Sequence, residues 1–386
     1  MLEKALEFNH PLHIVFIDFK KAFDSLKLKS LWALLETTPL NKGYIHLLKL
    51  TYDGSEAKVK CESGITKSIK ILRGVKQGDV IAPLLFCVAI AAVIFKTEEE
   101  TKQITPSQDH KYSGFSIGGQ VISNLGYADD LALADSDRDQ LQAFVDKLSV
   151  HAKAIGLEIN INKTKSISTL SNTPLNIKID GETIEQTNNF VYLGHKITDS
   201  LNYKTTIQHR ISLAWAAFNK NDQILKSNRI PSKVKGKIYK TYVLPVVLYG
   251  MDCVTWTKPL INTLEVFQNN AMRIMTGHTL LDHIPIKDLR TMTDLVPIEA
   301  HIRSKTLKLF GHIKRSSTGL SKLCVEGMIE GQRSRGAPKR RWRENVKDWS
   351  EINSWETINS TCKNRKQWKK LSCINTQSAT FRRSAV

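Results

Sequence analysis

The chain has 386 residues, 41% of them hydrophobic, which is enough for two or three folded domains with a large core. Its 56 Lys and Arg residues outnumber 37 Asp and Glu, and the net charge of +19 is typical of a protein whose partner is made of phosphates. The charged N-terminal sequence argues against a signal peptide, and the six scattered cysteines argue against a disulfide framework or a zinc site. We therefore expect an intracellular protein, in the nucleus, the cytoplasm or both.

A membrane surface is the competing partner for so basic a chain. No apolar run is long enough to cross a bilayer, and no basic amphipathic helix stands out. The sequence therefore favours nucleic acid over membrane as the partner.

The first notable carboxylate, Asp18, directly follows an apolar run over 13–17 that predicts a strand. Taken alone, an aspartate at the end of a strand is most often the N-cap of the next helix. The apolar spacing over 19–36 does predict a helix that packs on a sheet, and a second helix is predicted over 42–52.

Two runs that alternate lysine with apolar residues, 57–61 and 66–72, flank Gly64 and predict a hairpin with one buried and one basic face. Solvated lysines that discourage edge pairing are the plain interpretation, and contact with a template backbone is the functional one. Gly74 and Gly78 then bracket a loop whose backbone can approach a ligand closely, ahead of a predicted helix over 81–95.

A second group of carboxylates, Asp129 and Asp130, interrupts an apolar run whose alternation predicts a hairpin with its tip at 128–130. A surface turn is the plain interpretation, but the tip lacks the glycine that a two-residue hairpin favours. Two like charges side by side raise each other's pKa unless a cation neutralises them. Together with Asp18, the pair predicts a site for two divalent metal ions that carries out phosphoryl transfer.

Beyond the paired carboxylates, the spacing predicts an amphipathic helix over 137–155 and a strand over 157–161. From about residue 200 the pattern becomes helical, with helices predicted over 207–218, 234–249, 263–276 and 289–313.

Five segments resemble, in order, the motifs of reverse transcriptases, and specifically those of non-LTR (LINE-like) retrotransposons. The segments are 16–24 (FIDFKKAFD), 73–86 (RGVKQGDVIAPLLF), 127–130 (YADD), 156–165 (GLEININKTK) and 190–197 (FVYLGHKI). A lone Asp-Asp pair would be weak evidence, whereas five motifs in sequence are strong evidence.

The resemblance implies an α+β fold. A right-hand polymerase palm, an antiparallel sheet with packed helices, would span 1–200, a helical thumb-like region 201–320 and a basic segment 321–386. The implied activity is RNA-directed DNA polymerisation, in which a deoxynucleoside triphosphate reacts with the 3′-hydroxyl of a DNA primer on an RNA template. It also implies that Asp18, Asp129 and Asp130 are the catalytic residues and hold two Mg²⁺ or Mn²⁺ ions.

The resemblance assigns further residues to the substrates. The nucleotide-binding residues would be Phe19, Phe23, Gln77, Gly78 and Lys163. The primer end would be held by Tyr192, Leu193 and Gly194.

Two of the motif residues have a plainer interpretation beside the family one. Helical periodicity alone makes Phe23 a core aromatic, and the resemblance adds a role in crowding the nucleotide 2′ position. Asp24 is expected to accept a structural hydrogen bond and not to bind metal. Asp79 departs from the family pattern and adds a carboxylate beside the nucleotide pocket.

The end of the chain is its most basic part, and its arginines alternate with tryptophan, which suits phosphate contact and base stacking. A nuclear-localisation signal or a solvated tail is the alternative, although the tryptophans argue that part of the segment folds. The residues predicted to bind nucleic acid here are Arg333, Arg335, Arg340, Arg341 and Trp342.

Two function classes remain open. The intact carboxylates favour an active polymerase, whereas the strand to Asp18 begins almost at once, without the fingers region that the family carries and without an upstream endonuclease. That absence favours a fragment or a catalytically silent nucleic-acid-binding relic. A basic protein of the membrane surface is the third and least supported class.

Overall fold

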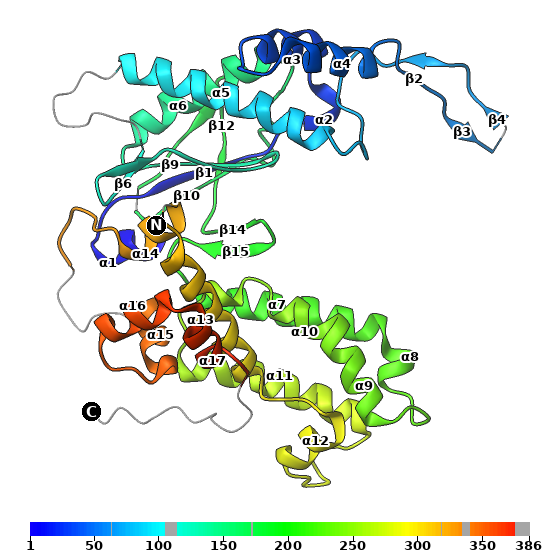
Figure 1. The fold of residues 1–386 in the computed structure, drawn as a ribbon, viewed down its shortest axis with the longest axis vertical. Coiled ribbons are helices and arrows are strands. Elements are labelled where there is room, and N and C mark those ends of the chain that lie inside the picture. The colour runs from blue at the N-terminus through cyan, green and yellow to red at the C-terminus, as the bar shows by residue number, and fades with distance from the viewer. Residues whose placement is uncertain (63, 105–113, 171–172, 318, 334–339, 375–386) are drawn as a thin grey trace. The chain divides into compact units, whose positions relative to one another are not determined.

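The computed structural model describes residues 1–62, 64–104, 114–170, 173–317, 319–333 and 340–374 (Figure 1). The chain divides into two compact units. The first comprises Met1–Leu193 with Ile329–Arg333, and the second comprises Gly194–Met328 with Ser334–Val386. The predicted three-part division at residues 200 and 320 is not tested by this partition and stays a prediction.

The first unit is built on a five-stranded sheet with the strand order β13–β10–β1–β9–β8. Every pair in it is antiparallel except β10 with β13. The strands are β1 (His13–Ile17), β8 (Asn124–Tyr127), β9 (Asp130–Asp135), β10 (Lys165–Ser168) and β13 (Glu185–Gln186). This sheet confirms the predicted α+β class and the predicted strand before Asp18.

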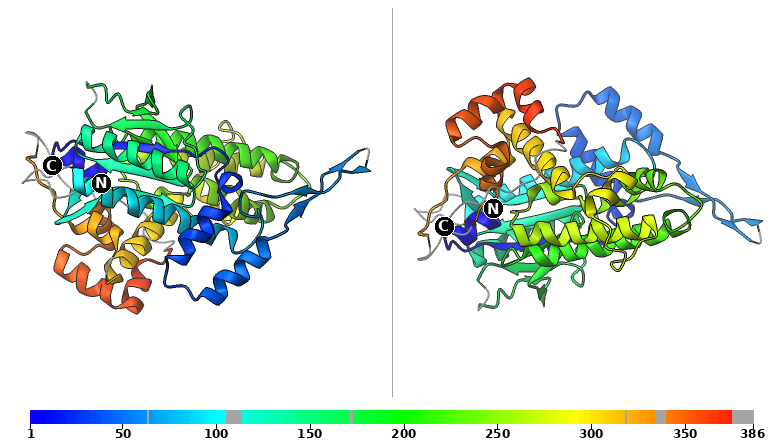
Figure 2. Two further views of the ribbon diagram at one scale, coloured as in Figure 1. Left: turned by 90° about the horizontal axis from the view of Figure 1, so that it is seen from above. Right: turned by 90° about the horizontal axis from the view of Figure 1, so that it is seen from below.

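Two long helices, α5 (Ala82–Ile104) and α6 (Arg138–Ala154), cover one face of this sheet (Figures 1 and 2). The sheet's side chains alternate as strand geometry requires, and Val15, Ile17 and Leu133 are buried in the same core as these helices. Asp137 caps α6 through its side chain, which accepts from the backbone N–H groups of residues 139 and 140. The predicted helix over 137–155 is confirmed, and the one over 81–95 is longer than predicted.

The predicted helix over 19–36 is wrong as a single element. It is broken into α2 (Ala22–Ser25) and α3 (Leu28–Glu36), and the backbone N–H of Lys27 donates to the carbonyl of Ile155 at 2.8 Å. Close packing at the same point explains the break, because a side chain on Gly156 would lie 2.7 Å from the backbone oxygen of Ser25.

The predicted strand over 157–161 is also wrong. The segment makes one isolated bridge, between Ile159 and Phe19, and the strand β10 begins four residues later at Lys165. Thr164 N donates to the carbonyl of Asn160 at 2.9 Å, so the chain makes a turn between the bridge and the strand β10.

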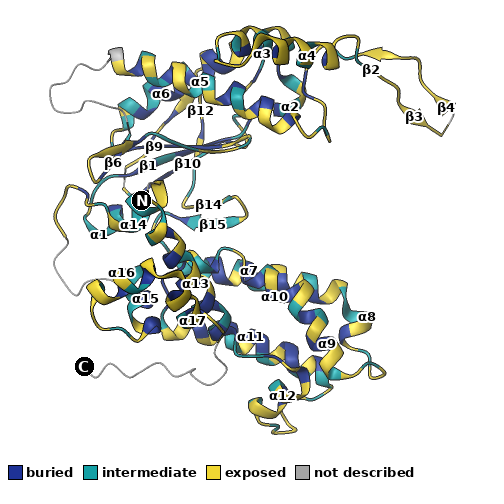
Figure 3. Cartoon of the chain, viewed as in Figure 1, coloured by how far each residue is buried: buried dark blue, intermediate teal, exposed yellow. Residues whose placement is uncertain are grey.

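The predicted helix over 42–52 is confirmed as α4 (Lys42–Tyr52), and a projecting arm follows it. The arm is formed by the two-residue strands β2 (Glu56–Ala57), β3 (Lys60–Cys61), β4 (Gly64–Ile65) and β5 (Ile69–Lys70). All four strands are exposed, as the yellow ribbon of Figure 3 shows, so the prediction of one buried face was wrong.

Short elements complete the first unit. They are α1 (Leu2–Glu7), β6 (Phe115–Ile117), β7 (Gln120–Ile122), β11 (Lys178–Ile179), β12 (Glu182–Thr183) and β14 (Asn189–Tyr192). β6 and β7 pair as an antiparallel hairpin. The segment Ile329–Arg333 belongs here because Arg333 forms an ion pair with Glu7 at 3.0 Å and stacks over the ring of Phe8.

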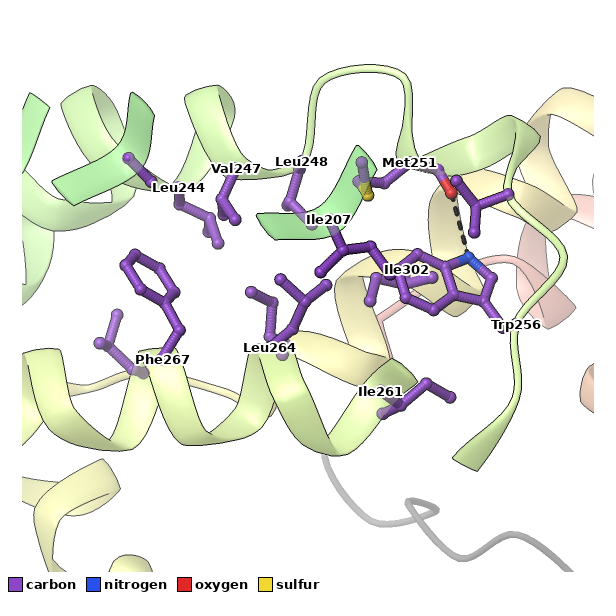
Figure 4. Close-up of a cluster of buried hydrophobic side chains, with 14 of the residues drawn as sticks. Ile207, Leu244, Val247, Leu248, Met251, Trp256, Ile261, Leu264, Phe267 and Ile302 are labelled. Atoms are coloured by element: carbon purple, nitrogen blue, oxygen red, sulfur yellow. Dashed lines mark hydrogen bonds between the residues drawn. The ribbon is translucent and has the colours of Figure 1, made fainter. Parts of the chain in front are cut away.

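The second unit is helical around a core rich in leucine, methionine and aromatic side chains (Figure 4). Its elements are β15 (His195–Thr198), α7 (Tyr203–Lys220), α8 (Asp222–Leu225), α9 (Ser232–Ile238), a π-helical turn (Tyr239–Val243), α10 (Leu244–Val247), a 3₁₀ turn (Met251–Cys253), α11 (Lys258–Thr276), α12 (Ile286–Thr293), α13 (Ile298–Arg315), α14 (Leu320–Glu326), α15 (Trp342–Ser350), α16 (Trp355–Lys363) and α17 (Arg365–Leu371).

Two of the four helices predicted here are interrupted. The one over 234–249 contains the π-helical turn, which ends before Pro245 at the start of α10. The one over 289–313 is divided between α12 and α13, where Asp294 adopts a positive φ of 54° and Pro297 caps the second helix.

The C-terminal helices α15, α16 and α17 share this core. Trp368 is 1% exposed and donates its indole N–H to the carbonyl of Leu307 on α13 at 2.7 Å. Asn345 is fully buried and bonds both backbone groups of Trp256. The prediction that the tryptophan-containing part of this segment folds is therefore confirmed.

None of the helices in the described ranges has both the length and the apolar character needed to span a membrane.

Candidate active site

Asp18 is carried to the edge of the sheet by β1 and is anchored there by its own backbone. Its N–H donates to Thr164 Oγ1 at 3.2 Å, and its carbonyl accepts from Asn160 N at 2.7 Å. Thr164 is fully buried, so the anchor lies in the protein interior. The carboxylate of Asp18 is therefore attached to a fixed backbone on both sides.

The register of the sheet brings the second group of carboxylates to the same end. Ile17 pairs with Leu131 across the antiparallel β1–β9 ladder, so the residues that follow and precede them, Asp18 and Asp130, lie at one edge. Tyr127 pairs with Asp130, which makes Ala128-Asp129 the turn. The tip is thus one residue shorter than predicted, since Asp130 is already part of β9.

The turn itself is strained, because Ala128 adopts a φ of 54° in the left-handed region that glycine usually occupies. The sequence had shown that the tip lacks glycine. The structure shows that alanine takes the strained position, an arrangement that costs of order 1–3 kcal/mol and clusters at functional sites.

The three carboxylates interact electrostatically. Partial burial of the Asp130 carboxyl raises its pKa above the ordinary value of 3.8, and the negative charges of Asp129 and then Asp18 raise it further. Asp18 Oδ2 is buried and has no hydrogen-bond partner, and the nearest cation in the described ion pairs is Lys163, whose Nζ lies 4.0 Å away. Negative charge is thus concentrated here without full compensation.

Asp18 and Asp130 open on one pocket of about 360 Å³. It is lined by Phe16, Ile17, Asp18, Asp130, Asn162, Lys163, Lys165, Phe190 and Tyr192. Over the part of the chain that the structure describes, no three His, Cys, Asp or Glu side chains are close enough together to form a ready metal-binding group.

Aromatic side chains form part of the pocket wall. Phe16 stacks on Phe190 with ring centroids 4.5 Å apart, and Tyr192 lies 5.3 Å from Phe16. The Tyr192 hydroxyl donates to the carbonyls of Leu125 at 3.1 Å and Asp130 at 3.4 Å. Burial and the charge of Asp130 raise the pKa of Tyr192, so this hydroxyl keeps its proton and its role as a donor.

The sequence of this unit matches a known family. The profile of the family described as "Reverse transcriptase (RNA-dependent DNA polymerase)" matches residues 3–197, which is half of the chain. The chain belongs to the reverse transcriptase family. The predicted resemblance to non-LTR retrotransposon enzymes is confirmed, because the relatives include Pol polyproteins of R2 retrotransposable elements.

Two curated relatives show how far the similarity extends. A transposon-derived protein of Caenorhabditis elegans is 25% identical over 270 residues, which are 65% of this chain and 95% of that protein. The R2 Pol polyprotein of Nasonia vitripennis is 30% identical over 157 residues, 41% of this chain but 14% of that protein. Among solved structures, apo telomerase from Candida tropicalis aligns with 93% of this chain and 53% of its own, at 12% identity and a TM-score of 0.41.

The predicted nucleotide-binding residues lie in different surroundings. Phe19 is buried, and Phe23 is partly buried and stacks on Phe86 at 4.6 Å, so its plain interpretation as a core aromatic is confirmed. Gln77 donates to Asp24 Oδ1 at 3.3 Å, which confirms Asp24 as a structural acceptor. Gly78 is exposed, with a φ of 88° and open space where a side chain would stand.

The loop that carries Gln77 and Gly78 is fixed at both ends. Gly74 has a φ of 85°, and a side chain there would lie 2.8 Å from the backbone of Asp24, so only glycine fits. Asp79, the departure from the family pattern, accepts from the backbone N–H of Ile81 at 3.1 Å and from the Tyr52 hydroxyl at 3.3 Å. Its carboxylate therefore caps the loop internally.

The residues predicted to contact nucleic acid in the C-terminal part are engaged in local contacts. Arg333 pairs with Glu7 in the first unit, whereas Arg340 pairs with Asp348 and Arg341 with Glu344 in the second. Arg335 lies outside the described residues. These ion pairs are exposed or half-exposed, and such pairs contribute little to stability.

The base-stacking role predicted for Trp342 does not agree with its position. The side chain is 8% exposed, belongs to the core of the second unit and donates its indole N–H to the carbonyl of Asp252 at 2.7 Å. The prediction failed because a tryptophan among arginines was interpreted as a surface stacking residue, whereas spacing within α15 places it on the buried face of that helix.

Sequence reasoning missed several residues of the pocket. Asn162 and Phe190 line it, and neither had been assigned a role on its own, although both lie within segments of the resemblance. Lys165 lines it as well, but its Nζ pairs with Glu185 Oε2 at 2.5 Å, which leaves Lys163 as the lysine beside Asp18. The signal that could have identified Phe190 is its apolar strand beside Tyr192.

Proposed function

We propose that the first unit catalyses RNA-templated addition of deoxynucleotides to the 3′-hydroxyl of a DNA primer, with Asp18, Asp129 and Asp130 at the reaction centre. The observation that carries the proposal is the buried Oδ2 of Asp18, which has no hydrogen-bond partner, on a residue that shares one pocket with Asp130. Carboxylates that repel each other and lack compensation are costly unless a cation joins them.

The donor set suits a hard divalent cation. Carboxylate oxygens are preferred by Mg²⁺ and Mn²⁺, and Mg²⁺ in polymerase sites takes one or two carboxylates together with substrate phosphates. Asp18 and Asp130 are the residues that would hold such ions, with Asp129 beside them. When bound, a pair of these ions supplies stabilisation of the attacking and leaving oxygens of the displacement.

The remaining residues of the pocket have roles that follow from their contacts. Lys163, exposed beside Asp18, provides a positive charge for the triphosphate. Tyr192 holds the carbonyl of Asp130 and thereby fixes the start of β9. Phe16 and Phe190 exclude water from the wall, which strengthens every charge interaction within the pocket.

The proposed partners follow from charge as well as family. A net charge of +19 suits binding of a primer–template duplex, since each neutralised phosphate releases counterions. Primer and template binding by the segment Tyr192-Leu193-Gly194 and by the C-terminal arginines is part of the proposal, as is an intracellular location with access to RNA.

A catalytically silent nucleic-acid-binding protein is the second candidate. It is favoured by the lack of a ready three-residue metal group among the described residues and by the approach of Lys163 to Asp18. In this alternative Lys163 replaces the cation, and the duplex is bound without reaction.

Metal titration and primer extension decide between the two. Mg²⁺ or Mn²⁺ should raise the unfolding temperature of the unaltered protein, and that increase should be lost in Asp130→Asn and in Asp18→Asn. Asp53→Asn, at an exposed carboxylate distant in sequence from the motifs, is the matched control and should keep it. Extension of a DNA primer on an RNA template should depend on the same two residues. If metal leaves the unfolding temperature unchanged and no primer is extended, the silent alternative holds.

A further inference from the structure

Within the second unit, helix α7 is bonded to the backbone of the segment that begins at Gly194. The guanidinium of Arg210 donates through Nη2 to the carbonyl of Gly194. One turn earlier on the same helix, Thr206 Oγ1 donates to the carbonyl of Lys196 at 2.7 Å. Both donors are side chains that no sequence motif had identified.

Both contacts are made from the same face of helix α7. Thr206 and Arg210, four residues apart, lie on one face of helix α7, and their acceptors are the carbonyls of the turn residue Gly194 and of Lys196 in β15. This face of the helix therefore bonds the turn residue that precedes β15 and one residue within β15. A shift of the strand by one residue would break both bonds at once.

The burial of the charged Arg210 side chain is energetically unfavourable, which a merely structural role does not explain. Its side chain is buried, with the residue 6% exposed, and no carboxylate in the described ranges forms an ion pair with it. Its Nε has no hydrogen-bond partner either. The guanidinium instead lies over the ring of Tyr249, 4.4 Å from the centroid. Buried charges are normally paired, because desolvation of an unpaired charge is unfavourable.

The backbone around Arg210 has little freedom. Gly194 has a φ of 72°, and a side chain there would stand 3.4 Å from Arg210 Nη2 and 3.6 Å from Tyr249 Cε1. A side chain on Gly250 would lie 2.6 Å from His195 Nδ1. Burial and then the charge of Arg210 lower the pKa of His195, so that imidazole is neutral near pH 7 and adds no repulsion.

We propose that Arg210, supported by Tyr249 and Thr206, is a positioning residue that fixes the backbone at Gly194, the last residue of the Tyr192-Leu193-Gly194 segment proposed to hold the primer end. The inference rests on the proposed function. Its physical basis is that the Arg210 guanidinium donates to the Gly194 carbonyl and lies over the Tyr249 ring, so the carbonyl and its donor each have a defined partner. Arg210 acts through this backbone and touches no substrate.

The test compares four variants of the full chain. Arg210→Met removes the donor and the charge while keeping the length, and Thr206→Val removes the second donor. Tyr249→Leu removes the supporting ring at a residue that is 51% exposed, so folding is preserved there even if Arg210→Met unfolds. Arg229→Met, an exposed arginine of the same unit, is the matched control for the loss of one positive charge.

Two readouts separate positioning from general stability. Arg210→Met and Tyr249→Leu should lower kcat for primer extension by about 10- to 100-fold, because misplacement of a reacting end by about 1 Å costs about that much. KM for the deoxynucleotide should change by less than about 2-fold, since the nucleotide pocket lies in residues that Arg210 does not touch. Thr206→Val should give a smaller loss of the same kind, and Arg229→Met none.

The second readout needs no catalysis. Binding to a duplex with a recessed 3′ end should weaken about 10-fold in Arg210→Met and Tyr249→Leu relative to Arg229→Met, while binding to a blunt duplex stays equal among them. If the unaltered protein extends no primer but this discrimination is seen, the proposed polymerase function fails and the positioning role stands. If extension and discrimination are both unchanged in Tyr249→Leu and in folded Arg210→Met, the positioning role is wrong.

Discussion

Asn345 offers a direct test of whether the C-terminal basic segment is an integral part of the helical unit. Its side chain is fully buried on α15, and it makes two hydrogen bonds to one residue 89 positions earlier. Asn345 Oδ1 accepts from Trp256 N at 2.8 Å, and Asn345 Nδ2 donates to Trp256 O at 2.9 Å. The side-chain amide of Asn345 therefore satisfies both backbone hydrogen-bonding groups of Trp256, as a neighbouring strand would.

The expected cost of Asn345→Ala can be worked out from these contacts. The substitution leaves one buried N–H and one buried C=O without partners, and each such group costs about 1–3 kcal/mol. The free energy of unfolding should therefore fall by about 2–6 kcal/mol, a large share of the about 5–15 kcal/mol that a folded domain has. At about 2–4 °C per kcal/mol for a unit of this size, a loss near 4 kcal/mol lowers Tm by about 8–16 °C.

The measurement is thermal and urea unfolding of the full chain, followed by the Trp fluorescence of the second unit. Asn353→Ala provides the control, because Asn353 is exposed in the same segment and its loss should change stability by less than about 0.5 kcal/mol. Equal Tm values for the two variants would refute the reasoning. In that case residues 340–374 would unfold independently of the helices before them.

Two further predictions concern the carboxylates and a helix contact. Without divalent metal, Asp130→Asn should be more stable than the unaltered protein near pH 7, by less than about 1 kcal/mol because the site is partly solvated. The folded state binds the proton of the Asp130 carboxyl more tightly than the unfolded chain does, because folding raises the pKa. The stability advantage of Asp130→Asn should therefore appear as pH rises from 3.8 through the raised pKa and vanish below 3.8. Urea unfolding at several pH values checks this, and an advantage that persists in acid contradicts it. Gly236→Ala should destabilise by about 1–3 kcal/mol despite better helix propensity, because the added carbon would lie 1.8 Å from the carbonyl oxygen of Thr293. Gly43→Ala, whose nearest neighbour is a side-chain atom at 3.2 Å, should change unfolding far less, and equal effects would contradict the prediction.

The carboxylates of the site could be predicted from sequence because the chemistry that marks them is local. Asp18 ends an apolar strand, and Asp129-Asp130 interrupts another. Charged side chains in apolar segments are energetically unfavourable, and packing alone does not explain their presence. The antiparallel pairing of β1 with β9 then brings them together, and that pairing followed from the family resemblance. The unpartnered oxygen of Asp18 needed the structure, because it depends on which side chains fail to reach it.

The errors in the fold have a common physical origin in contacts between distant segments. The helix over 19–36 breaks where Lys27 bonds Ile155, more than a hundred residues away. The strand β10 was missed because its residues Ser166 and Ser168 are polar, although they are buried. Ser168 Oγ is hydrogen-bonded to His13 Nδ1 at 2.9 Å across the sheet, whereas Ser166 Oγ has no hydrogen-bond partner.

Arg210 illustrates why positioning residues escape a motif search more readily than reacting ones. A carboxylate that binds metal must lie in a recognisable sequence pattern, because the strand that delivers it is short and apolar. A residue that donates to a backbone carbonyl needs only to lie on the correct face of a helix at hydrogen-bonding distance. Helix α7 carries many polar residues that satisfy this sequence pattern equally well. Burial separates them, since Arg210 and Thr206 are interior while the neighbouring Gln208 is exposed. The desolvation penalty of a side chain is therefore a better indicator of such residues than a sequence motif. A charge that is buried without a counter-charge indicates that its position is required.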